Sequence, residues 1–322
     1  MNKTGNILFI NTFKEECGIH QYGLNIFKAL TLHKENLEFN YTYATPKSLV
    51  EFRNLLSQGD YKAVIVNYVS IIFPWLNSFN KSEFPNTKFI DIIHEQTKQH
   101  HKTFFSNYFF DFSFFASPLA QVEAGLFKLP RLIPEITSNV FKEPTHITVG
   151  SFGFGIMDRG WLQTIDRVQE EFDQANIVFH MPFNTVVDPG GNYHAKHTAA
   201  ACRTRPLKPG VTLSIEHGFL STEDMVSWLS RNTINLFLYQ EKTPKGISST
   251  IDFALAANRP IGISSSPMFR HLVEVEPAIN VEKNTLKSII ERGPSILDKY
   301  REDWNSKTFT AYLDTQLKLN IL

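Results

Sequence analysis

The segment KGISSTIDFALAANRPIGIS, residues 245–264, combines residues that can bind an anion with the pattern of a buried helix. Gly246 allows close approach of the backbone. Ser248 and Ser249 can cap a helix over 248–257 and leave its first amides pointing outward. A helix N-terminus carries a partial positive charge that favours phosphate groups. The segment therefore predicts a phosphate-binding helix start.

Two cationic side chains can assist such a site. Lys245 directly precedes Gly246, and Arg159 lies in the sequence Asp158-Arg159-Gly160-Trp161. Arginine can bind two phosphate oxygens at once through its planar guanidinium group. In the alternative interpretation, both residues are ordinary surface charges.

Further candidate residues follow two of the expected strands of the first half. His94 and Glu95 end the expected strand KFIDIIHE, and Gly18 and His20 follow the expected first strand. Ligands bind at the carboxyl ends of the strands in open α/β sheets. An imidazole suits this place because near neutral pH it can accept a hydroxyl proton or donate to a ligand oxygen. The alternative is a histidine that only hydrogen-bonds to backbone at the strand end.

The alternation of strands and helices predicts two doubly wound α/β domains with parallel sheets, rather than a barrel or a sandwich. Expected strands lie at 7–10, 37–43, 63–67, 88–93, 112–116, 147–152, 176–180, 211–216, 234–239 and 260–264. Expected helices lie at 22–30, 49–56, 161–172, 223–230 and 248–257.

These elements group into domains at 1–134 and 147–294, joined by a proline-containing linker at 135–146. We expect the amphipathic segment 295–322 to pack back across the domains, and 188–210 to form a surface excursion. The cleft between the two domains is the expected working site.

Four motifs occur in an order that resembles one family. ILFINTF with EECGIHQYGLNIFKAL looks like a first strand and its glycine loop, and ITVGSFGF followed by DRGW looks like the opening of a second domain. GVTLSIEHGFLSTEDMVSWL and the segment 245–264 follow in turn. Together the motifs resemble nucleotide-sugar glycosyltransferases with two facing Rossmann-like domains, the GT-B fold, and especially glycosyltransferase family 4.

The resemblance implies a hexosyltransferase that moves a hexose from a nucleoside-diphosphate sugar to a hydroxyl of a glycan or glycolipid, with retention at the anomeric carbon. No Asp-x-Asp triplet occurs, so we expect no metal and no cofactor besides the nucleotide sugar. The backbone at Phe219 would contact the base, although Ser221 and Asp224 also form a capping box that explains this turn. The implied donor-binding residues are Gly18, Arg159, Phe219, Lys245, Gly246, Ser248 and Ser249; the catalytic ones are His94 and Asp252, with His20 and Glu95 on the acceptor side.

The sequence also departs from the family pattern. The family's two glutamates would fall at Lys245 and Phe253, and Phe152 stands near the place of its "VGR" arginine. Asp252 replaces the second glutamate if the turn before Pro260 is one residue longer; otherwise it only suits a helix start. Two alternatives follow: a nucleotide-sugar epimerase of the same architecture, and a non-catalytic relative that binds sugar nucleotides or glycans.

Composition limits the remaining classes. The chain has 322 residues with 32 basic and 32 acidic side chains, so bulk charge does not indicate nucleic-acid binding. Only Cys17 and Cys202 occur, and the N-terminus lacks a signal-peptide pattern, so we expect a cytoplasmic protein. The aromatic run FFSNYFFDFSFF after His100-His101-Lys102 indicates either peripheral membrane contact or core. We discount Cys17 as a nucleophile, and His194, His197 and Cys202 as metal ligands.

Overall fold

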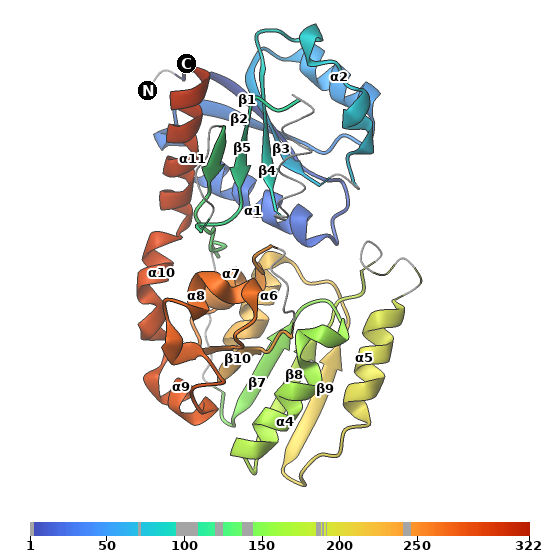
Figure 1. Ribbon diagram of the computed structural model, residues 1–322, viewed down its shortest axis with the longest axis vertical. Coiled ribbons are helices and arrows are strands. Elements are labelled where there is room, and N and C mark those ends of the chain that lie inside the picture. Colours follow the sequence, from blue (N-terminus) through green and yellow to red (C-terminus); the bar gives the residue numbers. More distant parts are fainter. Residues whose placement is uncertain are drawn as a thin grey trace. The chain divides into compact units, whose positions relative to one another are not determined.

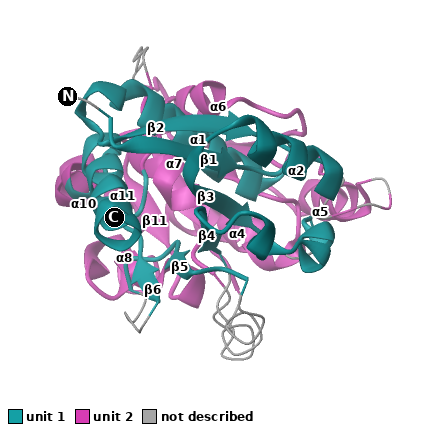
Figure 2. Cartoon of the chain, turned by 90° about the horizontal axis from the view of Figure 1, so that it is seen from above, with its two compact units in different colours: residues 1–132, 303–322 teal, residues 133–302 magenta. Residues whose placement is uncertain are grey.

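The structure is a computed structural model that describes residues 3–69, 72–94, 109–119, 125–136, 144–184, 188, 190, 192–240 and 246–322. By its internal contacts the chain divides into two compact units, coloured separately in Figure 2. Unit 1 comprises residues 1–132 and 303–322, and unit 2 comprises residues 133–302. The last helix of the chain therefore belongs to the same unit as its first strand.

Unit 1 is built on a parallel sheet with the strand order β2-β1-β3-β4-β5-β6 (Figure 1). Its strands are β1 (Gly5–Ile10), β2 (Phe39–Ala44), β3 (Tyr61–Tyr68), β4 (Lys88–Ile93), β5 (Phe112–Phe115) and β6 (Leu126–Lys128). Consecutive apolar positions are buried in β1 and β3. Such runs are typical of parallel strands that are covered on both faces.

Helices α1 (Gly18–Leu32) and α11 (Ser306–Ile321) pack against one face of this sheet and share its core. Asp314 of α11 accepts hydrogen bonds from the backbone N–H of Glu38 and from the hydroxyl of Tyr41, each at 2.7 Å. Burial, together with the Asp314 carboxylate, raises the pKa of Tyr41 well above its ordinary value. The C-terminal helix is thus tied to unit 1 by polar as well as apolar contacts.

The aromatic run packs inside unit 1 as far as the structure describes it. The ring of Phe109 lies 5.7 Å from Phe79 and 5.6 Å from Phe89, and all four residues of β5 are buried. Residues 95–108, with the basic residues before the run, lie outside the described residues. The core interpretation therefore holds from Phe109 onward. None of the helices in the described ranges is both long and apolar enough to cross a membrane.

Unit 2 is built on a second parallel sheet with the order β11-β10-β7-β8-β9. Its strands are β7 (Thr148–Phe152), β8 (Ala175–His180), β9 (Val211–Glu216), β10 (Ile234–Phe237) and β11 (Ile261–Ile263). The principal helices are α4 (Trp161–Glu171), α5 (Tyr193–Arg203), α6 (Thr222–Ser230), α7 (Thr250–Ala256), α8 (Arg270–Val273) and α9 (Leu286–Arg292). The helix α2 (Leu49–Gln58) belongs to unit 1, and α10 (Asp298–Asp303) directly precedes α11 in the chain.

Two local predictions were wrong, and strand β6 was missed. The expected surface excursion contains α5, whose Ala199 and Cys202 are fully buried in the core of unit 2. The prediction missed this helix because its buried face is formed by small residues such as those of AAAC, whereas the pattern used to recognise helices relies on large apolar residues. Strand β6 was not predicted, and α7 begins at Thr250, two residues later than expected.

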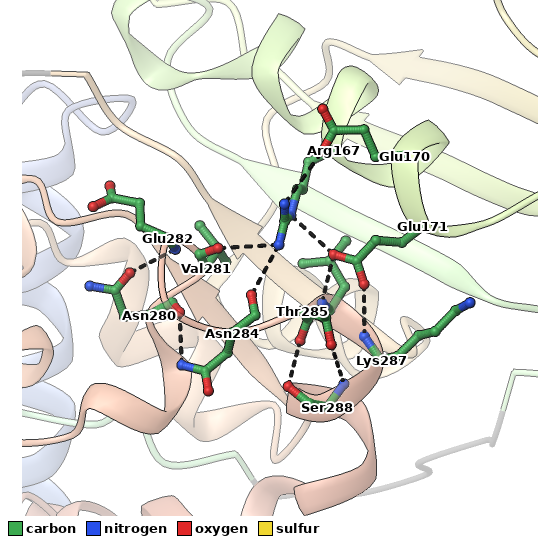
Figure 3. A network of polar contacts seen from close by, with 11 residues as sticks. Arg167, Glu170, Glu171, Asn280, Val281, Glu282, Asn284, Thr285, Lys287 and Ser288 are labelled. Carbon is green, nitrogen blue, oxygen red and sulfur yellow. Dashed lines mark hydrogen bonds and ion pairs between the residues drawn. The ribbon is translucent and has the colours of Figure 1, made fainter.

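A polar network joins α4 to the segment that leads into α9 (Figure 3). Arg167 donates to the carbonyl oxygens of Val281, at 3.3 Å, and Asn284, at 3.0 Å. Glu171 accepts hydrogen bonds from the N–H groups of Leu286, at 2.9 Å, and Lys287, at 3.2 Å, at the start of α9. These bonds satisfy helix-end donors that would otherwise lack partners and hold α9 on unit 2.

Candidate functional site

In unit 1, a polar group lies at the carboxyl ends of three neighbouring strands. Asn11 follows β1, Asn67 is the second-last residue of β3, and His94 follows β4. The Asn67 Nδ2 lies 2.8 Å from Asn11 Oδ1 and 2.7 Å from the carbonyl oxygen of Ile19. The Asn67 Oδ1 lies 2.6 Å from His94 Nε2. The sheet and the start of α1 thus join three polar side chains in one hydrogen-bonded chain.

Close packing of α1 makes this arrangement dependent on Gly23. A Cβ at Gly23 would lie 2.5 Å from both Asn11 Oδ1 and Asn67 Nδ2. Any larger residue would therefore displace the amide pair. The helix packs directly onto the amides because this position is glycine.

The His94 ring packs against Tyr22 and is electrically neutral near pH 7. The ring centroids of His94 and Tyr22 are 5.1 Å apart in an edge-on arrangement, and the Arg131 guanidinium lies 5.8 Å from the Tyr22 ring. Burial, with the Arg131 charge as a second cause, lowers the pKa of His94 to about 3. His94 is therefore a weak base but a competent hydrogen-bonding group.

The other residues predicted for unit 1 have varied surroundings. His20 is buried, and its Nδ1 donates to the carbonyl oxygen of Thr12 at 2.5 Å. Gly18 begins α1, and no atom lies within 4 Å of a Cβ built there. The protein itself therefore does not require glycine at this position. Cys17 is buried directly before α1, and Glu95 lies outside the described residues.

In unit 2, Arg159 lies in a turn at the carboxyl edge of the second sheet. Its guanidinium lies 4.1 Å from the centroid of the Tyr239 ring, which follows β10. Gly160 has a left-handed φ of 76°, and a Cβ there would lie 1.9 Å from the carbonyl oxygen of Leu238. The turn that carries Arg159 thus contacts Leu238, the residue after β10, so closely that only glycine fits.

Tyr239 also contacts the segment expected to bind phosphate. Its hydroxyl lies 3.4 Å from the hydroxyls of Ser248 and Thr250, which are 2.8 Å from each other. Tyr239 therefore brings Arg159 and the start of α7 to the same place in unit 2.

Two expectations for this segment were wrong. The Ser248 N–H donates to the carbonyl oxygen of Met268 at 3.1 Å and is not available to a ligand. Ser249 precedes α7 but makes no side-chain capping bond, and the Ser248 hydroxyl pairs with Thr250 instead. The Gly246 carbonyl oxygen accepts a hydrogen bond from Arg270 at 2.9 Å. Lys245 lies outside the described residues.

Two phenylalanines meet where the family resemblance would place charged groups. The rings of Phe152 and Phe253 are 5.6 Å apart and nearly perpendicular. Asp252, beside Phe253 in the first turn of α7, is buried. An apolar pair thus occupies these positions.

The expected base-binding turn is exposed and ends in a helix cap. The Phe219 side chain is 47% exposed, and the Ser221 Oγ accepts from the Asp224 N–H at 3.1 Å. The predicted cap of α6 is therefore confirmed. On α5, His194 and His197 are exposed while Cys202 is buried, and the described residues contain no cluster of three or more residues suited to a metal ion.

The sequence analysis missed Asn11, Asn67 and Tyr239. No short motif marks them, because each acts through partners from other elements. Their place at strand ends is the one available signal, since the carboxyl edge of a parallel sheet collects polar groups.

Comparison with solved structures supports the fold, whereas comparison of the sequence with known families finds no match. No family model matches the sequence, and no curated protein matches it. The structure of HepE from Anabaena in complex with UDP and glucose is similar, with a TM-score of 0.63 and 10% identity over 97% of this chain and 99% of that one. A trehalose-phosphate synthase from Burkholderia vietnamiensis gives a TM-score of 0.62 and 9% identity over 99% and 97%. A glycosyltransferase from Rickettsia africae gives 0.56 and 12% over 100% and 95%.

Identities of 9 to 12% show the fold alone. The predicted fold class, two doubly wound parallel-sheet units of the GT-B type, is confirmed. The resemblance to family 4 stays a prediction.

Proposed function

We propose that the chain is a glycosyltransferase that uses a nucleoside-diphosphate sugar as its donor. The observation that carries this proposal is the structural similarity, over nearly the full length of both chains, to HepE in complex with UDP and glucose. Polar groups at the carboxyl edges of both sheets add support, because ligands of α/β proteins bind there. UDP-glucose is therefore the first donor to test.

In this proposal, unit 2 binds the diphosphate. Arg159 supplies positive charge, and Tyr239 positions it beside the segment from Gly246 to Thr250. Because the Ser248 N–H is already bonded, we assign phosphate contact to Arg159, Lys245 and the Ser249 N–H. Cationic groups aimed at the developing charge of the leaving diphosphate can replace a metal ion, so we propose a metal-independent reaction.

In unit 1, His94 is proposed to contact a sugar or acceptor hydroxyl. Glu95, the next residue in the sequence, and Gly18 and His20 at the start of α1 are proposed to assist on the acceptor side. The bond between the sugar C1 and the diphosphate breaks, and the acceptor oxygen forms a new bond to C1 with retained configuration. Since the pKa of His94 is about 3, we assign the acceptor proton to a phosphate oxygen of the leaving diphosphate. The acceptor is proposed to be a glycan or glycolipid, handled by a cytoplasmic enzyme.

A thermal-shift panel of UDP-, GDP-, ADP- and dTDP-linked sugars, with and without EDTA, tests the donor site. We expect one nucleotide class to stabilise the wild type whether or not EDTA is present, and Arg159→Ala to abolish this shift. Arg203→Ala is the control, because Arg203 is an exposed arginine of the same unit. No stabilisation by any donor, or equal loss in both variants, would contradict the proposal.

A further inference from the structure

The orientation of both amides in unit 1 follows from their backbone partners. Asn11 Nδ2 lies 2.9 Å from the carbonyl oxygen of His20, and Asn11 Oδ1 lies 2.9 Å from the Thr12 N–H. A carbonyl can only accept and an N–H can only donate, so the nitrogen and oxygen of Asn11 cannot be exchanged.

The same argument fixes Asn67. The carbonyl oxygen of Ile19 requires a donor, and Asn11 Oδ1 requires a second one. Both N–H groups of Asn67 are therefore used, and its Oδ1 is the atom that faces His94 Nε2 at 2.6 Å. An amide oxygen can only accept, so Nε2 must carry a proton.

We propose that Asn67, held in place by Asn11, is a positioning residue that fixes His94 as its Nε2–H tautomer and leaves Nδ1 as a hydrogen-bond acceptor for a ligand hydroxyl. This inference rests on the proposed function, which supplies a sugar or acceptor hydroxyl as that ligand. The role of His94 then differs from that of an acid or base, because no proton moves to or from the ring.

Two neighbouring features agree with this role. The low pKa of His94 keeps the ring uncharged, and only an uncharged ring has a nitrogen lone pair to offer. His20 shows the opposite arrangement, since its Nδ1 donates to the Thr12 carbonyl oxygen. The fold therefore fixes the tautomer of each histidine by a hydrogen bond to a different ring nitrogen, Nε2 in His94 and Nδ1 in His20.

The tautomer can be measured without any turnover. The full chain is labelled with 15N-histidine, and the His94 signals are assigned by their loss in His94→Gln. We expect a protonated Nε2 and an unprotonated Nδ1 at neutral pH, and a mixture of tautomers in Asn67→Ala. The control, Tyr22→Phe, keeps the ring edge against His94 and leaves the amide pair intact, so it should retain the wild-type signals. A protonated Nδ1 in the wild type, or unchanged signals in Asn67→Ala, would overturn the inference.

Kinetics give a second test. We expect Asn67→Ala to lower kcat about tenfold, the factor that corresponds to one ordinary hydrogen bond, with little change in the donor KM. Asn67→Asp places a carboxylate against Nε2 and should raise the pKa of His94, so kcat should fall on acidification within about pH 5 to 8. The wild type should show no such decrease from His94.

The two proposals fail in different ways. If no donor supports transfer but the tautomers behave as expected, the proposed function is wrong and the fixed tautomer stands as a property of the fold. If transfer occurs and Asn67→Ala changes neither the tautomer nor kcat, the inference is wrong and the proposed function stands.

Discussion

The carboxyl edges of the two sheets carry chemically different groups. In unit 1, uncharged amides bonded to backbone lead to a neutral imidazole at His94. In unit 2, the guanidinium of Arg159 rests on the Tyr239 ring beside a group of hydroxyls. The first edge suits a directional hydrogen bond to an uncharged hydroxyl, and the second suits an anion. In the proposed function, the hydroxyl is therefore assigned to unit 1 and the diphosphate to unit 2.

The largest expected effect concerns Asp91, a buried carboxyl in β4 of unit 1. Its side chain is fully buried, and Ser113 lies opposite on β5, where its hydroxyl lowers the pKa of Asp91 less than burial raises it. Burial raises its pKa to about 7. The folded state then holds a proton that the unfolded state releases, so the contribution of Asp91 to stability should fall as pH rises from about 4 to 7, by roughly 4 kcal/mol.

Asp91→Asn should remove this loss, and hydrogen exchange of the β3–β5 peptides at several pH values would show it. The contribution of His94 to stability changes with pH in the opposite direction. Its pKa is about 3 in the folded state and about 6.5 in the unfolded state, so its contribution falls as pH drops below about 6.5. The variant should therefore show stability that rises with pH in that range. If exchange in β3–β5 of the wild type and of Asp91→Asn had the same pH dependence, the buried carboxyl would not be protonated.

The next effect concerns Gly160 in unit 2. Gly160→Ala forces a Cβ against the Leu238 carbonyl oxygen at a left-handed φ, and it should cost about 3 kcal/mol or more of unfolding free energy. Gly18→Ala is the matched control in unit 1, since open space surrounds its Cβ and alanine favours a helix. Denaturant unfolding compares them. A loss in Gly160→Ala no greater than in Gly18→Ala would refute the close contact with Leu238.

The secondary structure was largely predictable, because short runs such as ILFI and AVIV, rich in β-branched residues, are typical of buried parallel strands. His94 was predictable as a candidate from its place after β4. The hydrogen bonds of the sites were not, because Asn67 meets Asn11 only through the register of β1 and β3. The Ser248 N–H similarly bonds to Met268, which lies beyond the next strand, and no local pattern specifies that partner.

A smaller effect is expected at the α4–α9 network. Glu171→Ala leaves the N–H groups of Leu286 and Lys287 without their carboxylate, and should cost about 2 kcal/mol of unfolding free energy. Glu170→Ala is the control, because Glu170 is 62% exposed and its ion pair with Arg167 should contribute little. Thermal unfolding of both variants tests this, and equal stability would show that the network does not hold α9.

The smallest effect is expected at the cap of α6. Ser221→Ala removes the oxygen that accepts from the Asp224 N–H and should cost about 1 kcal/mol. Ser221→Asn restores a capping side chain and should recover most of the loss. Donor binding should stay unchanged in both if only the backbone of this turn meets the ligand. A Ser221→Ala variant with normal stability but weak donor binding would assign Ser221 to the site instead.

The most direct test of the central claim is to measure donor affinity and turnover together in His94→Ala. Calorimetry with the donor found in the thermal-shift panel gives Kd, and release of nucleoside diphosphate in the presence of acceptor gives kcat. We predict that kcat falls about a hundredfold or more while the donor Kd changes little, because His94 acts on a hydroxyl during transfer and Arg159 holds the diphosphate. Equal loss of affinity and turnover, or undiminished turnover, would contradict the account.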